Sequence, residues 1–246
     1  MTCRFAPPRL SSKKAREITV WGIERGVLKA GHPTLRNSHL TSYLLEGTIN
    51  SVPSTSSAMR DRLLDVAQDL VQRRGLNAMS FQDLSNSVGI RKASVHHHFA
   101  SKSDMVSALL ARYREHFSTR VELILLAKSS GSAKLKAYFA LFSETLQEEP
   151  HEKGCLCGML AAELLSLRED TLEHVRGFFQ DNTHAIVQIL RYGRRDGTLS
   201  YRGDPTRFAG VILSSLEGAL LISRCEGGPE SLDSVLRMLL DLAKAD

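Results

Sequence analysis

From Met59 to the C-terminus, the apolar residues recur every three or four positions, which is the period of an α-helix. Leu63, Ala67 and Leu70 mark one face of a first helix, and Gly75 is placed to end it. No segment alternates apolar and polar residues as a half-buried strand does. The pattern therefore predicts an all-α protein.

Two short helices joined by a tight turn are predicted for residues 81–99, FQDLSNSVGIRKASVHHHF. Ser80 and Asp83 have the spacing of a capping box at the start of the first helix. Gly89 falls where the chain must turn, and Val95 supplies the buried side of the second helix. This arrangement is a helix-turn-helix, a unit that places its second helix in the major groove of DNA.

The outward side chains of this second helix are mostly hydrogen-bond donors, which suit phosphates and base edges. The small Ala93 would let the helix approach DNA closely. The expected contact residues on this helix are Arg91, Lys92, Ala93, Ser94, His96 and His97. The next helix begins beside Lys102, where free backbone N–H groups and an ammonium would together bind a phosphate.

Residues 59–104 closely resemble the N-terminal DNA-binding domain of the tetracycline-repressor (TetR) family of bacterial transcription regulators. The stretches that carry the resemblance are RDRLLDVAQDLVQRRG, SFQDLSNSVGIRKASVHHHF and SKSDM. The resemblance implies that residues 91–97 form the recognition helix and that Phe99 is a core residue. It also implies phosphate contacts from Ser80, His96 and Lys102.

Two positions depart from the family pattern. Ser85 stands where the family usually has alanine, and His96 replaces the usual tyrosine that touches the DNA backbone. The second difference puts that single contact in question.

The second half of the chain is similar to the ligand-binding half of a TetR subgroup in two stretches. These are GCLCGMLAAELL at 154–165 and LEGALLISR at 216–224. Some of the aromatic and soft residues there are expected to line an effector cavity, although most belong in a core. The candidate effector-binding residues are Phe142, Cys155, Met159, Glu163 and Phe178.

The last two predicted helices carry wide apolar stripes. We expect them to pair across a twofold axis as a four-helix bundle. The candidate dimerisation residues are Phe208, Ile212, Leu216, Leu220, Leu232, Leu236 and Leu239. Polar residues interrupt the stretch 208–223, so no membrane span is expected.

Cys155 and Cys157 stand at the start of a predicted helix, where backbone N–H groups lower the pKa of a thiol. This placement suits a redox or electrophile sensor, and the alternative is a pair of small apolar fillers. His96, His97 and His98 cannot all face one ion, because neighbours on a helix point about 100° apart. No metal, cofactor or catalytic residue is expected.

Positive charge is concentrated towards the N-terminus, which suits a polyanionic partner. Residues 1–58 carry eight Lys and Arg against three acidic residues, whereas residues 117–246 carry fifteen against eighteen. Residues 1–58 also lack periodicity, and we expect a mostly disordered basic tail. A transit peptide, or a leader upstream of a true start at Met59, would have the same composition.

The sequence thus predicts three parts: the tail (1–58), a three-helix helix-turn-helix DNA-binding domain (59–105), and a larger helical effector-binding and dimerisation domain (106–246). The favoured function is a cytoplasmic repressor that binds a palindromic operator as a homodimer. An unidentified small-molecule effector would release it from double-stranded DNA. The alternatives are a helical ligand-binding or cysteine-based redox-sensing protein that does not bind DNA, and a helical enzyme that uses Cys155.

Overall fold

The computed structural model describes residues 55–147 and 150–244, and every regular element in these ranges is a helix. The predicted all-α class is therefore confirmed. The α-helices are α1 (Thr55–Arg74), α2 (Phe81–Val88), α3 (Lys92–His98), α4 (Lys102–Leu126), α5 (Gly131–Ser143), α6 (Leu156–Ala162), α7 (Glu169–Arg195), α8 (Pro205–Glu226) and α9 (Glu230–Ala243). Single 3₁₀ turns follow α5 at Glu144–Leu146 and α6 at Leu164–Ser166.

The first helix starts earlier than the periodicity indicated. α1 begins at Thr55, four residues before Met59, so residues 55–58 of the predicted tail form its first turn. The remainder of that prediction, residues 1–54, lies outside the described residues. The inward face of α1 is as predicted, because Leu63 and Ala67 are fully buried.

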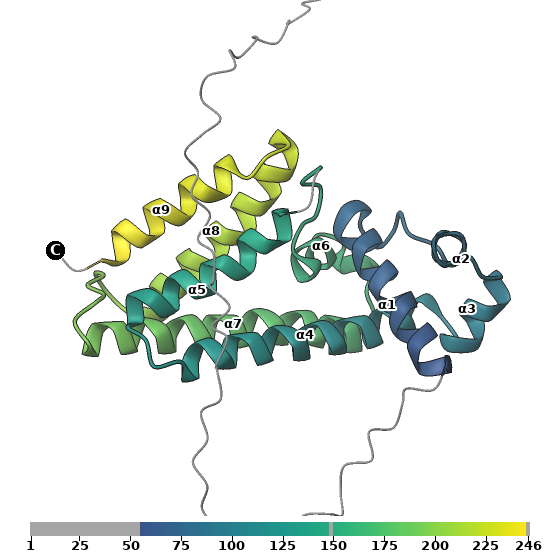
Figure 1. Cartoon of the computed structure of the whole chain (residues 1–246), viewed down its shortest axis with the longest axis horizontal. Helices are drawn as coiled ribbons and strands as arrows, with labels where there is room; N and C mark the ends of the chain where they lie inside the picture. The colour runs from purple at the N-terminus through teal and green to yellow at the C-terminus, as the bar shows by residue number, and fades with distance from the viewer. Residues whose placement is uncertain (1–54, 148–149, 245–246) are drawn as a thin grey trace, which may run out of the picture. The chain divides into compact units, whose positions relative to one another are not determined.

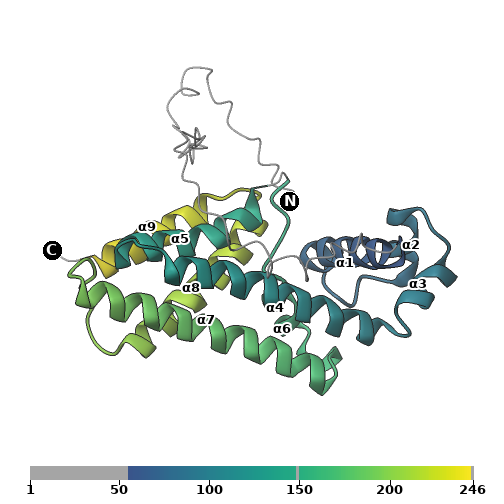
Figure 2. The ribbon, with the colours of Figure 1, turned by 60° about the horizontal axis from the view of Figure 1, so that its bottom comes forward.

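Helices α1, α2 and α3 form a small unit at one end of the described chain, and α4 runs from that unit into the rest of the protein (Figure 1). Figure 2 shows α4 and α7 side by side along most of their length. Helices α5, α8 and α9 pack beside this pair at the end opposite α1–α3 (Figure 1). The apolar core is continuous from Leu84 in α2 to Leu239 in α9.

Helix α8 has a buried face and an exposed apolar face. Leu216 is 0% exposed, whereas Leu221 is 49% exposed. By length and composition α8 is the one described helix apolar enough to cross a membrane, with a mean hydropathy of 1.4. Ser214, Ser215 and Glu217 interrupt the apolar stretch but do not lower its mean hydropathy below this criterion. The core helix of a soluble protein passes the same criterion, so α8 alone does not indicate a membrane protein.

Candidate DNA-binding face and effector site

Local capping fixes the geometry of the helix-turn-helix unit. The Asp83 backbone N–H donates to Ser80 Oγ, and the Ser80 backbone N–H donates to Asp83 Oδ2 at 2.8 Å, so the predicted capping box is present. Gly89 ends α2 with φ of +77°, a left-handed conformation that favours glycine. The turn then delivers α3, whose Val95 is fully buried against the core.

The polar side of α3 is open to solvent. Val95 and Phe99 face inward, and the other side of the helix carries no carboxylate. All six predicted contact residues of this segment are exposed: Arg91, Lys92, Ala93, Ser94, His96 and His97. The His96 ring also packs edge-on against Phe81 at 4.9 Å between centroids, which limits how far its imidazole can turn. The arrangement presents cations and donors on one short, accessible helix.

The two other predicted phosphate ligands flank α3. Ser80 is exposed at the start of α2, although its hydroxyl already donates to Asp83 Oδ2 at 2.6 Å. Lys102 is half-buried in the first turn of α4. Burial lowers the pKa of Lys102, and the nearby carboxylates of Glu163 and Asp83 oppose this shift. A phosphate bound there would therefore compete with two protein carboxylates.

The structure separates the predicted effector residues into two groups. Phe142, Phe178 and Cys155 are buried in the interior, where Phe117 links the two phenylalanines by ring contacts of 6.2 and 5.1 Å. Met159 is half-buried: its backbone N–H donates to the Cys155 carbonyl at 2.9 Å, and its Sδ accepts from Arg224 Nη1 at 3.0 Å.

Glu163 is not placed as a ligand-orienting acid. Its Oε2 accepts a hydrogen bond at 2.9 Å from the backbone N–H of Asn77, in the loop between α1 and α2. The neighbouring Asn77 side chain donates to Ser166 Oγ at 3.0 Å. Glu163 therefore joins the loop of the DNA-binding unit to the segment that follows α6, because its carboxylate accepts a backbone N–H of that loop.

The predicted lowering of the Cys155 pKa is wrong. Burial raises the pKa of Cys155 well above its usual value, and the Glu217 and Cys157 charges act in the same direction. A backbone hydrogen bond from Gly158 does lower it, as the helix start suggested, but burial dominates. Cys157 is fully buried, and burial raises its pKa as well. Both thiols therefore resemble the apolar fillers of the alternative interpretation.

Most of the predicted dimerisation residues are buried within their own chain. Ile212, Leu216, Leu220, Leu232 and Leu239 are at most 3% exposed because they pack inside their own chain, and Phe208 and Leu236 are partly buried beside them. The apolar side chains that α8 and α9 leave in solvent lie on other faces of these helices. They are Val211, Leu221, Ile222, Met238 and Leu242.

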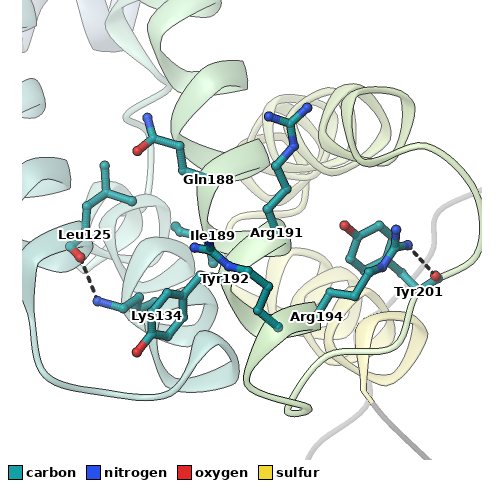
Figure 3. Close-up of a pocket in the computed structure, with 9 residues that line it drawn as sticks. Leu125, Lys134, Gln188, Ile189, Arg191, Tyr192, Arg194 and Tyr201 are labelled. Carbon is teal, nitrogen blue, oxygen red and sulfur yellow. Dashed lines mark hydrogen bonds between the residues drawn. The ribbon is translucent and has the colours of Figure 1, made fainter.

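Two clefts open beside α7. One, of about 310 Å³, lies between α4 and α7 and reaches the rings of Phe117 and Phe178. The other, of about 450 Å³, is lined by cations that include Lys134 and Arg194. Two of its cations bond the protein's own backbone (Figure 3): Lys134 donates to the Leu125 carbonyl at 2.7 Å, and Arg194 to the Tyr201 carbonyl at 2.9 Å. Arg191 and Arg195 also line this cleft. The first cleft is the better candidate route to the predicted effector residues, because it reaches Phe178.

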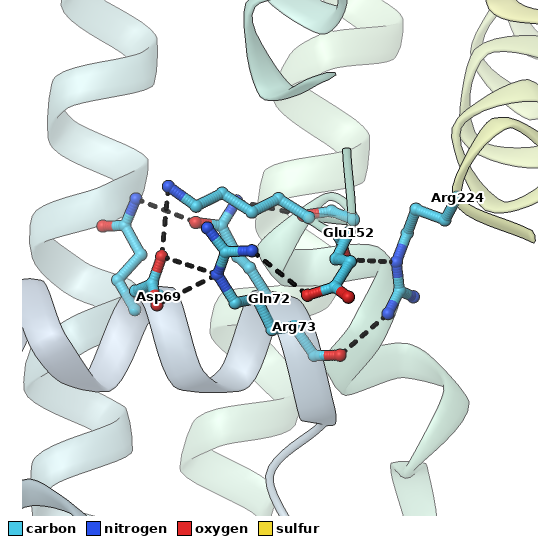
Figure 4. A network of polar contacts seen from close by, with 8 residues as sticks. Asp69, Gln72, Arg73, Glu152 and Arg224 are labelled. Carbon is cyan, nitrogen blue, oxygen red and sulfur yellow. Dashed lines mark hydrogen bonds and ion pairs between the residues drawn. The ribbon is translucent and has the colours of Figure 1, made fainter. Parts of the chain in front are cut away.

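A polar network that sequence reasoning missed joins the end of α1 to the segment before α6 and to α8 (Figure 4). Gln72 and Gly154 exchange two hydrogen bonds: the Gly154 backbone N–H donates to the Gln72 carbonyl, and Gln72 Nε2 donates to the Gly154 carbonyl, both at 3.0 Å. Arg224 of α8 donates to the carbonyls of Arg73 and Glu152. We call Gln72, Arg73, Glu152, Gly154 and Arg224 the latch.

An ion-pair cluster supports the latch. Asp69 contacts Arg73 and Lys153, both at 3.1 Å. Burial raises the pKa of Asp69, but hydrogen bonds from Lys153 and Arg73 outweigh it, so the net pKa is lowered. Arg73 also pairs with Glu152 at 3.3 Å. The Asp69–Arg73 pair has the i,i+4 spacing of a helix. No sequence signal marks the contacts with Lys153 and Glu152, because these partners lie about 80 residues further along the chain.

The chain has a helix-turn-helix unit, and the latch joins this unit to a helical body with a cleft between α4 and α7. These features are those of a DNA-binding protein with a separate regulatory domain. Residues 63–109 match the model for bacterial regulatory proteins of the tetR family, and residues 131–239 match the model for the tetracyclin repressor-like C-terminal domain. The chain belongs to the TetR family of transcriptional regulators.

Individual relatives agree with this assignment. The chain is 31% identical over 152 residues to the transcriptional repressor KstR2 of Mycolicibacterium smegmatis, covering 62% of this chain and 72% of the relative. It is 26% identical to the repressor NemR of Escherichia coli, covering 74% and 92%. A TetR-family regulator from Agrobacterium tumefaciens has a solved structure that superposes with a TM-score of 0.73, at 29% identity, over 77% of this chain and 100% of the other.

Proposed function

We propose that the protein is a repressor that binds a palindromic operator as a homodimer and is released by a small effector. The observation that carries this proposal is the exposed polar side of α3, which holds Arg91 and Lys92 and has no carboxylate. Such a helix can place donors in the major groove without repelling the phosphates. Two relatives, KstR2 and NemR, are named repressors, which supports repression over activation.

The exposed apolar side chains of α8 and α9 support dimerisation. Leu221, Ile222 and Met238 are 49%, 53% and 61% exposed. An exposed apolar patch of neighbouring side chains such as these often marks an interface with another protein. A twofold axis would bring the same helices of two copies together and bury these residues. The recognition helices would then need a spacing of about 34–36 Å, or a multiple of it, to enter major grooves on one side of DNA.

The latch supports a mechanism of release. A displacement of the segment 152–154 would pull on the end of α1 through the hydrogen bonds of Gly154 with Gln72 and of Glu152 with Arg73. Because α1 packs against α2 and α4, its displacement would reorient α3. An effector that prefers the displaced arrangement must weaken DNA binding by the same factor by which DNA weakens effector binding.

Selection of an operator from random DNA, followed by a salt titration of binding, tests this function. We expect a palindromic site, a stoichiometry of two chains per site, and an affinity that falls steeply with salt. The variant Arg91→Ala/Lys92→Ala should lose binding, whereas Lys136→Ala, an exposed cation in α5, should retain it. Selection of no sequence, with no salt dependence, would reject the proposal.

A further inference from the structure

A carboxylate with an unused oxygen lies inside the regulatory domain. Glu217 is on α8, and its Oε1 is buried with no hydrogen-bond partner. Only three buried side-chain polar atoms of the described residues share this condition. Glu217 as a whole is half-buried, but an acceptor oxygen that is shielded from water and has no donor is costly, which calls for an explanation.

The surroundings offer the carboxylate little compensation. Its side-chain partner is the Cys155 thiol, a weak donor. Burial raises the pKa of Glu217 to about 7, and the bond from Cys155 offsets only part of this effect. Tyr113 of α4, Tyr138 of α5 and Cys157 of α6 also lie within electrostatic reach of Glu217, and none of them carries a positive charge.

Gly158 provides the space that the carboxylate occupies. A Cβ at position 158 would overlap Glu217 Oε2, so a larger residue in α6 would push the acid away. The Glu217 side chain therefore reaches from α8 to α6 at Gly158. Cys155, just before this helix, leads directly to Gly154 of the latch.

A path of aromatic rings connects this acid to the cleft between α4 and α7. The cleft ends on Phe117 and Phe178, and the Phe178 ring lies 5.7 Å from that of Tyr113. Tyr113 in turn contacts Cys155, the partner of Glu217. Arg114 and Asp181 also line this cleft and pair at 2.7 Å. A compact molecule would have to displace the Phe117 and Phe178 side chains to reach the acid from this cleft.

We propose that Glu217 recognises an effector that carries a protonated amine or amidine on a compact aromatic or apolar body. The cation would donate to the unused Oε1, and the body would pack among the rings of Phe117, Phe178 and Tyr113. An anionic ligand would be repelled by the same carboxylate. This inference rests on the proposed function, because it assigns the chemistry of the effector that releases the repressor.

Calorimetry with a matched probe set tests the proposal on the full chain. The probes are six primary amines and amidines whose apolar groups increase in size, starting with phenethylamine and benzamidine. Each is compared with a carboxylate and an alcohol that carry the same apolar group. We expect at least one cation to bind, and Glu217→Gln to weaken it by about tenfold or more, since a charge-assisted bond is lost. The matched alcohol should change less than about threefold, and Glu173→Gln, an exposed acid on α7, should change nothing.

The pH dependence provides a readout that a merely structural role would not move. Cation affinity should rise from about pH 6 to pH 8 in the wild type, as Glu217 loses its proton, and stay flat in Glu217→Gln. Three results would overturn the proposal: no cation in the set binds, a carboxylate binds better than its matched amine, or Glu217→Gln binds the cation as tightly as the wild type.

Measuring DNA binding by anisotropy separates this inference from the repressor function. If the selected cation binds through Glu217 but the protein binds no operator, the repressor proposal fails and the ligand site stands. If the operator is bound and cations bind independently of Glu217, the ligand site fails and the repressor proposal stands. If both proposals hold, the cation lowers operator affinity in the wild type and leaves it unchanged in Glu217→Gln.

Discussion

The backbone carbonyl of Arg73, at the end of α1, accepts a hydrogen bond of 2.9 Å from Arg224 Nη2 in α8, 151 positions later in the chain. The same guanidinium donates to the carbonyl of Glu152 and to the sulfur of Met159. One side chain thus ties together the DNA-binding unit, the segment before α6, and α6 itself. This tie is independent of α4, the helix that continues from one domain into the other.

Replacing Arg224 by alanine should loosen this tie. The freed carbonyls lose a charged donor, and we expect a loss of unfolding free energy of about 1–3 kcal/mol. Operator affinity should fall severalfold, because DNA binding must then order an α1 that the latch no longer holds. Chemical denaturation and anisotropy measure the two effects. Arg207→Ala, an exposed arginine at the start of α8, is the control; equal effects from both variants would contradict the role of the latch.

Lys102 and Lys92 should make different kinds of contact with DNA, the first with phosphate and the second with bases. Lys102→Ala should weaken binding to all sequences about equally and flatten the salt slope by about one, because a phosphate contact is lost. Lys92→Ala, or His97→Ala, should change the preferred sequence, at about 1–3 kcal/mol for the affected base pair. Competition binding against single-base operator variants distinguishes the two patterns. A sequence-selective loss from Lys102→Ala would contradict its assignment to phosphate.

The local features of the DNA-binding unit could be predicted because they depend on residues close in sequence. Ser80 and Asp83 are three positions apart, and Gly89 needs only its own conformational freedom. The position of Glu163 could not be predicted, because its partner Asn77 is 86 positions away and no periodicity indicates which loop it meets. The same holds for the unpaired oxygen of Glu217, because the residues around its carboxylate, such as Gly158, are far away in sequence.

The burial of the predicted dimerisation residues within the protomer has a different physical cause. Helix α8 is apolar on more than one side, so the 3.6-residue period identifies the helix without indicating which face its own core takes. The protomer buries Ile212 and Leu216 and leaves Val211 and Leu221 outside. A helix that is apolar on two sides can pack against its own chain on one side and a second copy on the other.

The revised face makes a direct prediction about assembly. Leu221→Glu and Met238→Glu should each yield a folded monomer, because a buried carboxylate at a dimer interface is costly and an exposed one is not. Leu216→Glu should instead unfold the protein, since Leu216 is 0% exposed within the protomer. Sedimentation and circular dichroism give the two readouts. Leu126→Glu, at an exposed leucine that ends α4, should leave the dimer intact; a dimer that survives Leu221→Glu and Met238→Glu would place the interface elsewhere.

The two buried thiols should react slowly. Cys155 and Cys157 are 5% and 0% exposed, and burial raises both pKa values, so little thiolate is present and access requires local opening. Iodoacetamide should label both at least about a hundredfold more slowly in the native protein than in urea, as measured by mass spectrometry of the peptides. Rapid labelling of Cys155 in the native protein would support the hypothesis of a redox or electrophile sensor at this position.

Glu217 should make the protein less stable as the pH rises from about 4.5 to about 7. Its pKa in the folded protein is about 7, against 4.5 for the free side chain, so between these values the folded state holds a proton that the unfolded state has lost. Stability due to this group is therefore fully present below about pH 4.5 and falls until about pH 7, by on the order of 3 kcal/mol. The Cys155, Cys157, Tyr113 and Tyr138 side chains stay protonated throughout this range, because burial raises their pKa values.

The difference in unfolding free energy between Glu217→Gln and the wild type isolates this contribution, because other titrating groups cancel. We expect the unfolding free energy of the variant to rise relative to that of the wild type from pH 5 to pH 8, most steeply below pH 7, and then to level off. Glu173→Gln, whose carboxylate is exposed, should show a flat difference over the same range. A flat difference for Glu217→Gln would mean that the acid is paired or hydrated when ionised, and a difference that favours the wild type at high pH would mean that its negative charge stabilises the fold.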